Sequence, residues 1–264
     1  MIKFTKMQGL GNDYVYLDCT KPHPEDLNAF ARRVSDRHFG VGSDGLICIC
    51  PSEKADFMMR MFNVDGSEGE MCGNGIRCVG KFVYDKGLTT KTSISVETLG
   101  GIKYLELTVT DGAVSAVTVD MGVPALESEI TVTVKGKDYP GIPVSMGNPH
   151  MVVFQDSIDD LPLEEIGPDF ECWEYFPNRV NTEFAQLIDR KTVRMRVWER
   201  GSGETMACGS GATAVAAAAH AAGLVDNVVT VKLLGGDLSI RLDDETGHAF
   251  MTGPAVTVFE GQLY

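Results

Sequence analysis

The sequence lacks several features that would assign it to common protein classes. It has no run of about 18 apolar residues, the length that a membrane-spanning helix requires. Its first residues, Met-Ile-Lys-Phe-Thr-Lys, contain no apolar segment of the kind found in a signal peptide. Basic residues are scarce, since 23 Lys and Arg stand against 37 Asp and Glu and give a net charge of −14. This deficit argues against a nucleic-acid partner or an anionic membrane surface.

The cysteines form neither a disulfide framework nor a recognisable metal site. There are seven, an odd number, and their spacings do not match the paired two-residue spacing of common zinc sites. We therefore expect free thiols, no bound metal and a reducing, cytoplasmic setting. With 44% hydrophobic and 23% charged residues in 264 positions, the composition is that of a globular protein with a packed core.

The main positive feature is an internal repeat at a constant separation of 136 residues. The segment that begins Met71-Cys72-Gly73-Asn74-Gly75 returns as Ala207-Cys208-Gly209-Ser210-Gly211, and 208 − 72 = 136. The same shift places Gly11-Asn12 over Gly147-Asn148 and Asn63 over Glu199. Self-similarity of this kind indicates structural repeats. Because only two copies fit in the chain, we expect two related units.

Local patterns predict more strands than helices. Alternating Val, Ile and Thr residues predict strands throughout, among them Gly45–Cys50, Ser93–Thr98 and Ala255–Phe259. Apolar residues at helical spacing predict a covering helix over Glu25–Phe39. We expect an α+β fold of two pseudo-symmetric domains, each a curved, mostly antiparallel sheet around a central helix, with an active site in the cleft between them. The expected domains are residues 1–115 with 254–264, and residues 116–253.

Each Cys-Gly-x-Gly motif follows a strand and a polar loop and opens a helix. A cysteine at a helix start lies near unpaired amide groups and the positive end of the helix dipole, which favour the thiolate. The glycines allow a ligand carboxylate to approach the same amides. Each cysteine alone could be a buried small hydrophobe, but the recurrence of both motifs favours a functional role. A nucleotide-binding loop is disfavoured because Phe82 stands where a Walker motif has Ser or Thr.

Two thiols on opposite sides of one carbon would support a specific reaction. One thiolate removes a proton from the carbon, and the opposing thiol delivers a proton to the other face. Thiols suit both roles because their pKa, near 8.5, can be tuned so that one is ionised and the other is not. Amides at the helix starts would stabilise the carbanion. The stereocentre inverts without a cofactor.

The chain resembles the diaminopimelate epimerase family over nearly its whole length. The segments that carry the resemblance follow one another in the family's order. They are Gly9–Asp13, Phe62–Glu68, Met71–Cys78, Gly147–His150, Arg179–Asn181, Val197–Gly201 and Ala207–Gly211. The family interconverts LL- and meso-2,6-diaminopimelate without pyridoxal phosphate, in lysine and peptidoglycan precursor synthesis. The resemblance also implies a homodimer, with a small molecule as the remaining partner and no metal or cofactor.

The resemblance also implies roles for individual residues. Cys72 and Cys208 are the expected acid–base pair, with His150 and Glu199 as catalytic polar groups close to them. The expected ligands of the reacting α-carboxylate are Gly73, Asn74, Gly209 and Ser210. The expected ligands of the remaining amino and carboxylate groups are Asn12, Asn63, Asn148, Asn181 and Arg200.

One departure from the family and two alternatives qualify this interpretation. Some relatives have Gln in the segment where this chain has Gly45, which provides no side chain for a ligand. Another cofactor-free isomerase with the same double fold, such as a proline racemase-like or phenazine-biosynthesis-like enzyme, is the closest alternative. A thiol–disulfide switch that uses Cys72 and Cys208 is an alternative of a different class. Exchange of a substrate α-proton with solvent deuterium would distinguish an epimerase from a redox protein.

Overall fold

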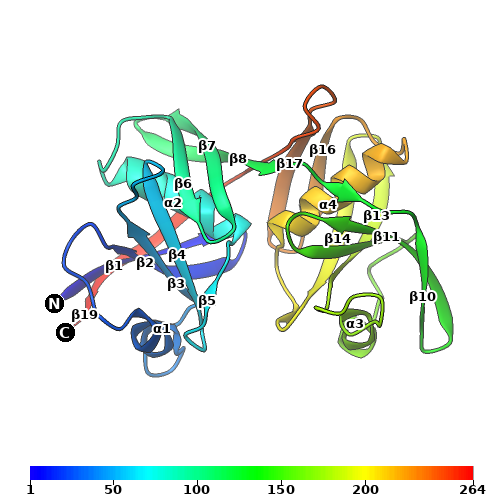
Figure 1. Cartoon of the computed structure of the whole chain (residues 1–264), viewed down its shortest axis with the longest axis horizontal. Coiled ribbons are helices and arrows are strands. Elements are labelled where there is room, and N and C mark those ends of the chain that lie inside the picture. Colours follow the sequence, from blue (N-terminus) through cyan, green and yellow to red (C-terminus); the bar gives the residue numbers. More distant parts are fainter. Residues whose placement is uncertain (264) are drawn as a thin grey trace. The chain divides into compact units, whose positions relative to one another are not determined.

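The computed structural model describes residues 1–263, and these form two units, each with its own set of strands and helices (Figure 1). The first unit comprises residues 1–119 together with the C-terminal segment from residue 253, and the second comprises residues 120–252. The boundary along the chain lies four residues later than the expected end at residue 115 (119 − 115 = 4). The reason is that one uninterrupted strand, Ala113–Gly122, runs through this region.

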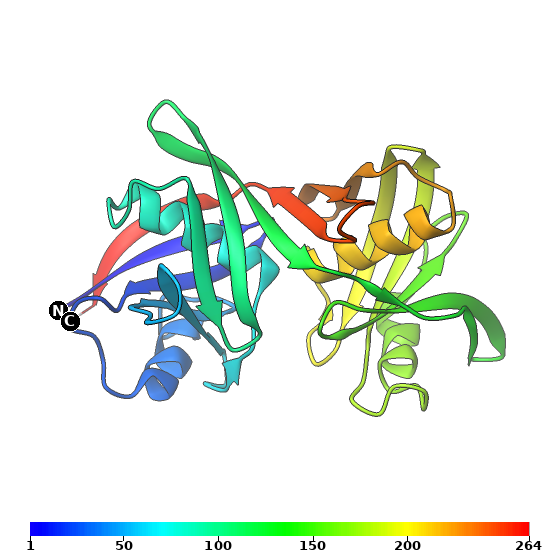
Figure 2. The ribbon, with the colours of Figure 1, turned by 45° about the horizontal axis from the view of Figure 1, so that its top comes forward.

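The elements of the first unit follow one another with short connections. They are β1 (Ile2–Gly9), β2 (Asn12–Asp18), α1 (Leu27–Ser35), β3 (Gly45–Cys50), β4 (Phe57–Asn63), β5 (Glu68–Gly69), α2 (Gly73–Asp85), β6 (Ser93–Thr98), β7 (Gly101–Thr110), β8 (Ala113–Gly122) and β19 (Val256–Leu263). The last strand, β19, pairs antiparallel with β1, so the N- and C-terminal segments lie side by side (Figure 1). Strands β7 and β8 form a long antiparallel hairpin (Figure 2).

The second unit repeats this order with one additional hairpin near its beginning. Its elements are β9 (Ala125–Leu126), β10 (Ile130–Val134), β11 (Lys137–Ser145), β12 (Pro149–Phe154), α3 (Leu163–Glu171), β13 (Asn181–Asp189), β14 (Thr192–Glu199), β15 (Gly203–Glu204), α4 (Gly209–Ala221), β16 (Val228–Leu233), β17 (Gly236–Leu242) and β18 (Ala249–Gly253). Strands β10 and β11 form the additional hairpin.

Both units share one register, which confirms the α+β fold built from a duplication. The parallel pair β2–β3 aligns Tyr14 with Gly45, and the parallel pair β12–β13 aligns His150 with Asn181, each residue 136 positions further along. The antiparallel pairs match in the same way. Leu46 lies opposite Phe62 in the first unit, and Thr182 lies opposite Trp198 in the second.

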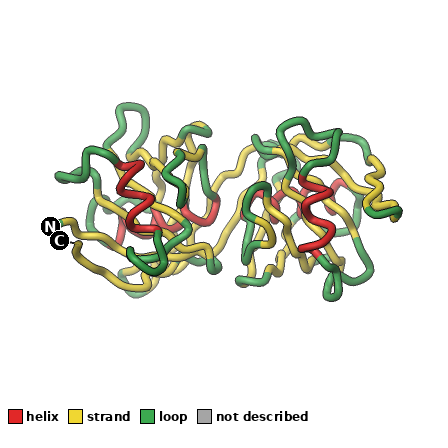
Figure 3. Tube along the Cα trace, turned by 90° about the horizontal axis from the view of Figure 1, so that it is seen from below, coloured by secondary structure: helices red, strands yellow, loops and turns green. Residues whose placement is uncertain are grey.

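A central helix packs among strands in each unit (Figure 3). In the first unit α2 contacts β1, β2, β7 and β19. In the second, α4 contacts strands from β11 to β17, and its Ala216–Ala219 run is buried. A helix that is apolar on all sides is a core helix, and alanine side chains allow strands to approach its backbone closely. Both cysteine motifs therefore open helices that the rest of their unit holds in place.

The helices α1 and α3 cover the outside of the sheets. Helix α1 buries Leu27, Phe30 and Val34, and the carboxylate of Asp26 caps its start by accepting a hydrogen bond from the Ala29 amide at 2.8 Å. The helix is shorter than the expected Glu25–Phe39 and ends at Ser35. No helix within residues 1–263 is long and apolar enough to cross a membrane.

Candidate active site

Cys72 and Cys208 are the N-caps of α2 and α4, and their local structures are nearly identical. Cys72 has φ −129° and ψ 117°, and Cys208 has φ −121° and ψ 114°. In each case the sulfur accepts a hydrogen bond from the amide of the third helical residue, Gly75 at 3.3 Å and Gly211 at 3.4 Å. Both sulfurs therefore lie at the positive end of a helix dipole, as the motif predicts.

The side-chain contacts of Cys72 differ from those of Cys208. The Cys72 thiol donates to Asn12 Oδ1 at 3.1 Å, so two residues that the resemblance assigns to one site are in contact. Asn12 Nδ2 in turn donates to Asp44 Oδ2 at 2.9 Å. The Cys208 sulfur lies 3.6 Å from the hydroxyl of Ser210, and either atom can donate.

A buried cation lies below the start of α2. Arg77 is fully buried, and its guanidinium donates to the carbonyl oxygens of Gly73 and Pro254, each at 3.1 Å. Burial lowers the pKa of Arg77, although the nearby Cys78 and Cys72 oppose the shift. Its equivalent in the second unit is Thr213, whose hydroxyl donates to the carbonyl of Gly209 at 2.9 Å. Both units thus cap the first helical carbonyl, but only α2 does so with a positive charge.

The start of α4 instead packs against a buried carboxylate paired with a histidine. His150 Nδ1 lies 2.7 Å from Glu183 Oε1, and both side chains are completely buried. A Cβ added to Gly211 would lie only 2.4 Å from the same Oε1, so the carboxylate is held against the helix. His150 Nε2 and Glu183 Oε2 are buried without a hydrogen-bond partner. Unpaired buried polar atoms are unusual in a native fold and are typical of functional sites.

These carboxylates overturn one expectation of the sequence analysis. We expected the helix start to favour the thiolate at both cysteines. Burial, together with the negative charges of Glu199 and Glu183, instead raises the pKa of the Cys208 thiol well above its ordinary value. The hydrogen bonds from Ser210 and the Gly211 amide act in the opposite direction but do not reverse the shift. Burial and the two carboxylates together outweigh these hydrogen bonds at Cys208.

The remaining expected residues of the first unit lie at the ends of β4 and α2. Asn63 ends β4, and its side-chain amide donates to the Ser67 hydroxyl at 3.0 Å. Gly73 is the first residue of α2, and Asn74 follows it with a side chain that is 3% exposed. Gly73 and Asn74 directly follow Cys72 in the sequence, whereas the Asn63 side chain is directed toward the turn that precedes the cysteine.

The remaining expected residues of the second unit fall into two groups. Asn181 is buried next to His150 in the β12–β13 register, and its Oδ1 accepts from the Arg200 backbone amide at 3.0 Å. The Arg200 guanidinium is exposed and donates to the Asn178 carbonyl at 3.2 Å. Glu199 is hydrogen-bonded by the Thr205 hydroxyl. Asn148 is half-buried in the turn before β12, and Gly209 and Ser210 open α4.

Sequence analysis missed Glu183, Asp44 and Arg77 as site components. Glu183 lies in β13, whose first five residues are all buried. One signal was available, because its equivalent 136 residues earlier is Ile47, a completely buried position. A carboxylate that replaces a buried isoleucine in a repeat requires a partner, and His150 is that partner.

Gly45 cannot be replaced by a larger residue in this backbone. A Cβ at this position would lie 2.2 Å from the carbonyl oxygen of Phe62 and 2.8 Å from the ring of Tyr14. The absence of a side chain at Gly45 therefore permits the close approach of the neighbouring strands. The preceding residue, Asp44, provides the polar side chain here, and its carboxylate accepts hydrogen bonds from Asn12 and Asp13.

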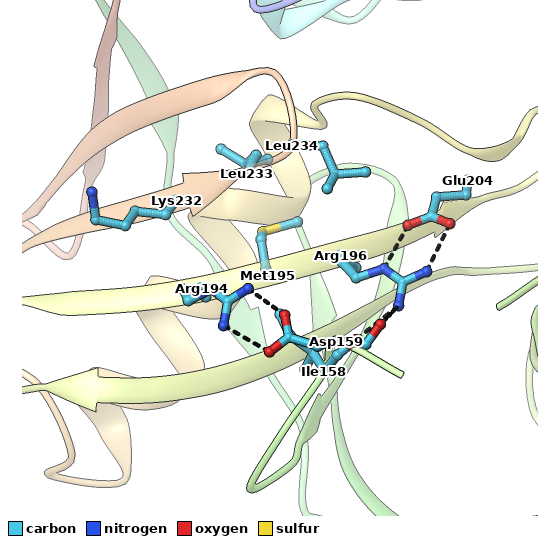
Figure 4. A pocket seen from close by; sticks show the side chains of 9 residues that line it. All are labelled: Ile158, Asp159, Arg194, Met195, Arg196, Glu204, Lys232, Leu233 and Leu234. Atoms are coloured by element: carbon cyan, nitrogen blue, oxygen red, sulfur yellow. Dashed lines mark hydrogen bonds and ion pairs between the residues drawn. The ribbon is translucent and has the colours of Figure 1, made fainter. Parts of the chain in front are cut away.

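A separate surface pocket of about 340 Å³ in the second unit contains none of the expected site residues (Figure 4). Its charged groups already have partners. Arg196 binds Glu204 through two hydrogen bonds of 2.7 and 2.9 Å, Arg194 pairs with Asp159, and Lys232 pairs with Asp237 outside the pocket. These arginines stabilise the loop before α3 against β14. The pocket is lined by Ile158, Asp159, Arg194, Met195, Arg196, Glu204, Lys232, Leu233 and Leu234.

Comparisons with known proteins agree with the sequence motifs. A family model described as diaminopimelate epimerase matches residues 4–127 and 142–258. A diaminopimelate epimerase of Methanococcus maripaludis strain C5 is 55% identical over 276 aligned residues, which cover 99% of each chain. Another, from Acetivibrio thermocellus, is 54% identical and covers 99% of this chain and 98% of its own length.

A solved structure shows the same fold at low identity. A hydroxyproline epimerase from Agrobacterium vitis superposes with a TM-score of 0.78 at 15% identity, and the match covers 99% of this chain and 90% of that one. At this identity the likeness concerns the fold alone. The family match and the relatives at 50–55% identity carry the assignment: the chain belongs to the diaminopimelate epimerase family.

Proposed function

We propose that this protein interconverts LL- and meso-2,6-diaminopimelate without pyridoxal phosphate, and that Cys72 and Cys208 are its acid–base pair. Membership of the family supports the substrate and the reaction class. The single structural observation that supports the mechanism is the matched geometry of the two thiols, each an N-cap whose sulfur accepts from the amide at the third helical position.

The reaction begins with one cysteine as thiolate and the other as thiol. The thiolate takes the α-proton and becomes a thiol, and the electron pair of the broken C–H bond enters the α-carboxylate system as an enolate. The second thiol then donates its proton to the opposite face of the α-carbon and becomes the thiolate. Protons and charge balance. At the end the first cysteine is a thiol and the second a thiolate, which is the arrangement that the reverse reaction requires. Helix-start amides would stabilise the negative charge that develops on the carboxylate.

The α-carboxylate of the substrate would bind at Gly73-Asn74 and Gly209-Ser210. The amide groups at the start of an α-helix are not used by the helix itself and favour anions. Asn12, Asn63, Asn148, Asn181 and Arg200 would bind the other polar groups of the substrate. A guanidinium such as that of Arg200 suits the distal carboxylate, since the two can form paired hydrogen bonds.

His150 and Glu199 would adjust the proton affinity of Cys208. Glu199 raises the pKa of this thiol by its charge, after burial, which is the larger cause. His150 is oriented by Glu183, which leaves its Nε2 unpaired within the second unit. A protonated imidazole at this place would offset the charge of the nearby carboxylates when Cys208 ionises. The proposal thus gives each predicted catalytic residue a defined electrostatic role.

The decisive experiment measures exchange and inversion separately. Purified protein is incubated with LL-diaminopimelate in D₂O, and the α-proton signal and the isomer ratio are followed by NMR and chiral chromatography. We expect the wild type to convert LL to meso with uptake of deuterium. Cys72→Ala and Cys208→Ala should each abolish inversion, whereas Cys172→Ala, at an exposed cysteine outside the site, should retain it. Full inversion by either active-site variant would exclude the two-thiol mechanism.

The alternatives predict different results in the same assay. A redox protein would leave the α-proton of the substrate in place. A proline racemase-like enzyme would exchange proline and not diaminopimelate. The proposal also includes a cytoplasmic location, supported by seven free thiols, and a homodimer, supported by the family resemblance. Light scattering of the purified protein tests the latter.

A further inference from the structure

The contact between Cys72 and Asn12 depends on a third residue, Asp44. Asp44 Oδ2 accepts two hydrogen bonds, from Asn12 Nδ2 at 2.9 Å and from the backbone amide of Asp13 at 3.0 Å. Its other oxygen accepts from Arg37 at 2.9 Å, and Arg37 also donates to Asp13 at 3.0 Å. Both oxygens of the carboxylate are therefore engaged.

This arrangement fixes which end of the Asn12 side chain meets the sulfur. An ionised carboxylate accepts hydrogen bonds and does not donate them, so only the NH₂ group of Asn12 can face Asp44. The amide oxygen must then face Cys72 Sγ, which lies 3.1 Å away. A carbonyl oxygen is also only an acceptor. The contact consequently requires a proton on sulfur and stabilises the Cys72 thiol relative to its thiolate.

The second unit, residues 120–252, has no equivalent of the hydrogen-bonded chain Asp44–Asn12–Cys72, which we call the acceptor relay. The Cys208 sulfur contacts the Gly211 amide, a donor, and the Ser210 hydroxyl, which can donate or accept. Asn12 corresponds in the repeat to Asn148, and Asp44 to Val180, an apolar residue that is completely buried. The duplication therefore provides the acceptor relay in one half only.

We propose that Asp44 is a positioning residue that, by orienting the Asn12 amide, holds Cys72 in its thiol form in the substrate-free protein. Asp44 does not touch the sulfur and acts through Asn12. When the amide of Asn12 is turned away, as by a substrate group that competes for it, the thiol loses its acceptor and releases its proton more readily. The catalytic meaning of this inference rests on the proposed function, but the protonation state of Cys72 can be measured without substrate.

Other groups around Cys72 also influence its charge, and the test must separate them from Asp44. Tyr14 and Tyr16 approach it from β2, and Arg77 and Cys78 approach it from α2. Burial raises the pKa of Tyr14 and Tyr16 well above the ordinary value, so both remain neutral. Arg77 keeps its positive charge and favours the thiolate. The charge of Asp44 also raises the pKa of Tyr14, so the effect that passes through Asn12 must be separated from this direct effect of charge.

The experiment is the pH dependence of Cys72 alkylation by iodoacetamide, resolved by peptide mass spectrometry. Only the thiolate reacts, so the half-maximal pH reports ionisation. Asp44→Ala should lower this pH by about one to two units, because a released amide can turn its NH₂ toward the sulfur and donate to the thiolate. Asp44→Asn keeps an acceptor for Asn12 and should give a smaller shift. Asp18→Ala, at the far end of β2 and paired with Lys21, is the matched control and should give none.

A double substitution decides whether Asp44 acts through Asn12 or by its charge alone. Asn12→Ala removes the acceptor and should itself lower the half-maximal pH, after which Asp44→Ala should add no further shift. Two results would overturn the proposal: an unchanged midpoint in Asp44→Ala, or an equal additional shift in the Asn12→Ala background. If Asp44→Ala fails to fold, Asn12→Ala and Asp44→Asn still give a decisive comparison. Absence of epimerase activity in the wild-type protein, together with the expected alkylation series, would refute the proposed function only.

Discussion

Substitution of Gly211 by alanine tests whether the His150–Glu183 pair is packed against α4 as described. A Cβ at this position would lie 2.4 Å from Glu183 Oε1 and 3.0 Å from its Cδ. Non-bonded heavy atoms settle near about 3.5 Å, so the carboxylate would have to move by roughly 1 Å. That oxygen is the one 2.7 Å from His150 Nδ1, and the displacement breaks the hydrogen bond.

The expected loss of stability is the balance of three contributions. Overpacking a core position costs about 1–3 kcal/mol, and a lost hydrogen bond to a charged group costs about 1.5–3 kcal/mol. Replacing glycine by alanine in a helix returns up to about 1 kcal/mol. We therefore expect Gly211→Ala to lower the free energy of unfolding by about 1.5–6 kcal/mol.

The repeat provides a matched control in Gly75, the equivalent position of α2. A Cβ there would meet Ile47 Cδ1 at 2.5 Å, the end of a flexible side chain that can rotate away. Gly75→Ala should remain within about 1 kcal/mol of the wild type. Urea unfolding followed by circular dichroism measures the free energy of unfolding of both variants. Tryptophan fluorescence reports on the second unit, because Trp173 and Trp198 both lie there. Equal losses in the two variants, or a neutral Gly211→Ala, would refute this account of the packing.

Three further predictions follow from charge and close approach. Burial and two carboxylates raise the pKa of Cys208, so its thiolate fraction is small at pH 8. Glu199→Gln removes a negative charge and lowers that pKa, and it should speed alkylation of Cys208, measured by peptide mass spectrometry, several-fold. A slower rate would contradict the assignment. Glu183→Gln should lower kcat roughly ten- to hundred-fold if it weakens a charge-assisted bond needed in the transition state, and an unchanged kcat would exclude that role. Gly45→Ala should destabilise the first unit by about 3 kcal/mol in urea unfolding, since its Cβ would lie 2.2 Å from the Phe62 carbonyl; full stability would contradict the strand spacing.

The fold was accessible from the sequence because its determinants are local and occur twice. Strands at Gly45–Cys50 and Ser93–Thr98 have the predicted bounds, since alternation and flanking turns define them. The helix expected over Glu25–Phe39 ends early because the Asp36 carboxylate accepts from the amides of His38 and Phe39, each at 2.8 Å, and a capping interaction of this kind replaces the next helical turn.

The electrostatics of the site were less accessible, because they depend on residues that are distant in sequence. Glu183 and His150 are 33 residues apart and meet through the parallel pair β12–β13. Asp44 reaches Asn12 through the pair β2–β3 in the same way. The sequence patterns predicted that the thiolate is favoured at both Cys72 and Cys208. Burial of the Cys208 thiol, followed by the negative charges of Glu199 and Glu183, raises its pKa, and no sequence motif indicates that burial.

The central claim is that two different thiols exchange protons with the two faces of one α-carbon. The most direct test is whether deuterium first appears in the product or in the remaining substrate. LL-diaminopimelate is incubated with the wild-type protein in D₂O, and product and remaining substrate are separated before a tenth of the substrate has been converted. The account predicts that the meso product carries deuterium at the inverted carbon while the remaining LL substrate is largely unlabelled. A meso product that retains the original α-proton would show that a single group moved it, and would contradict the account.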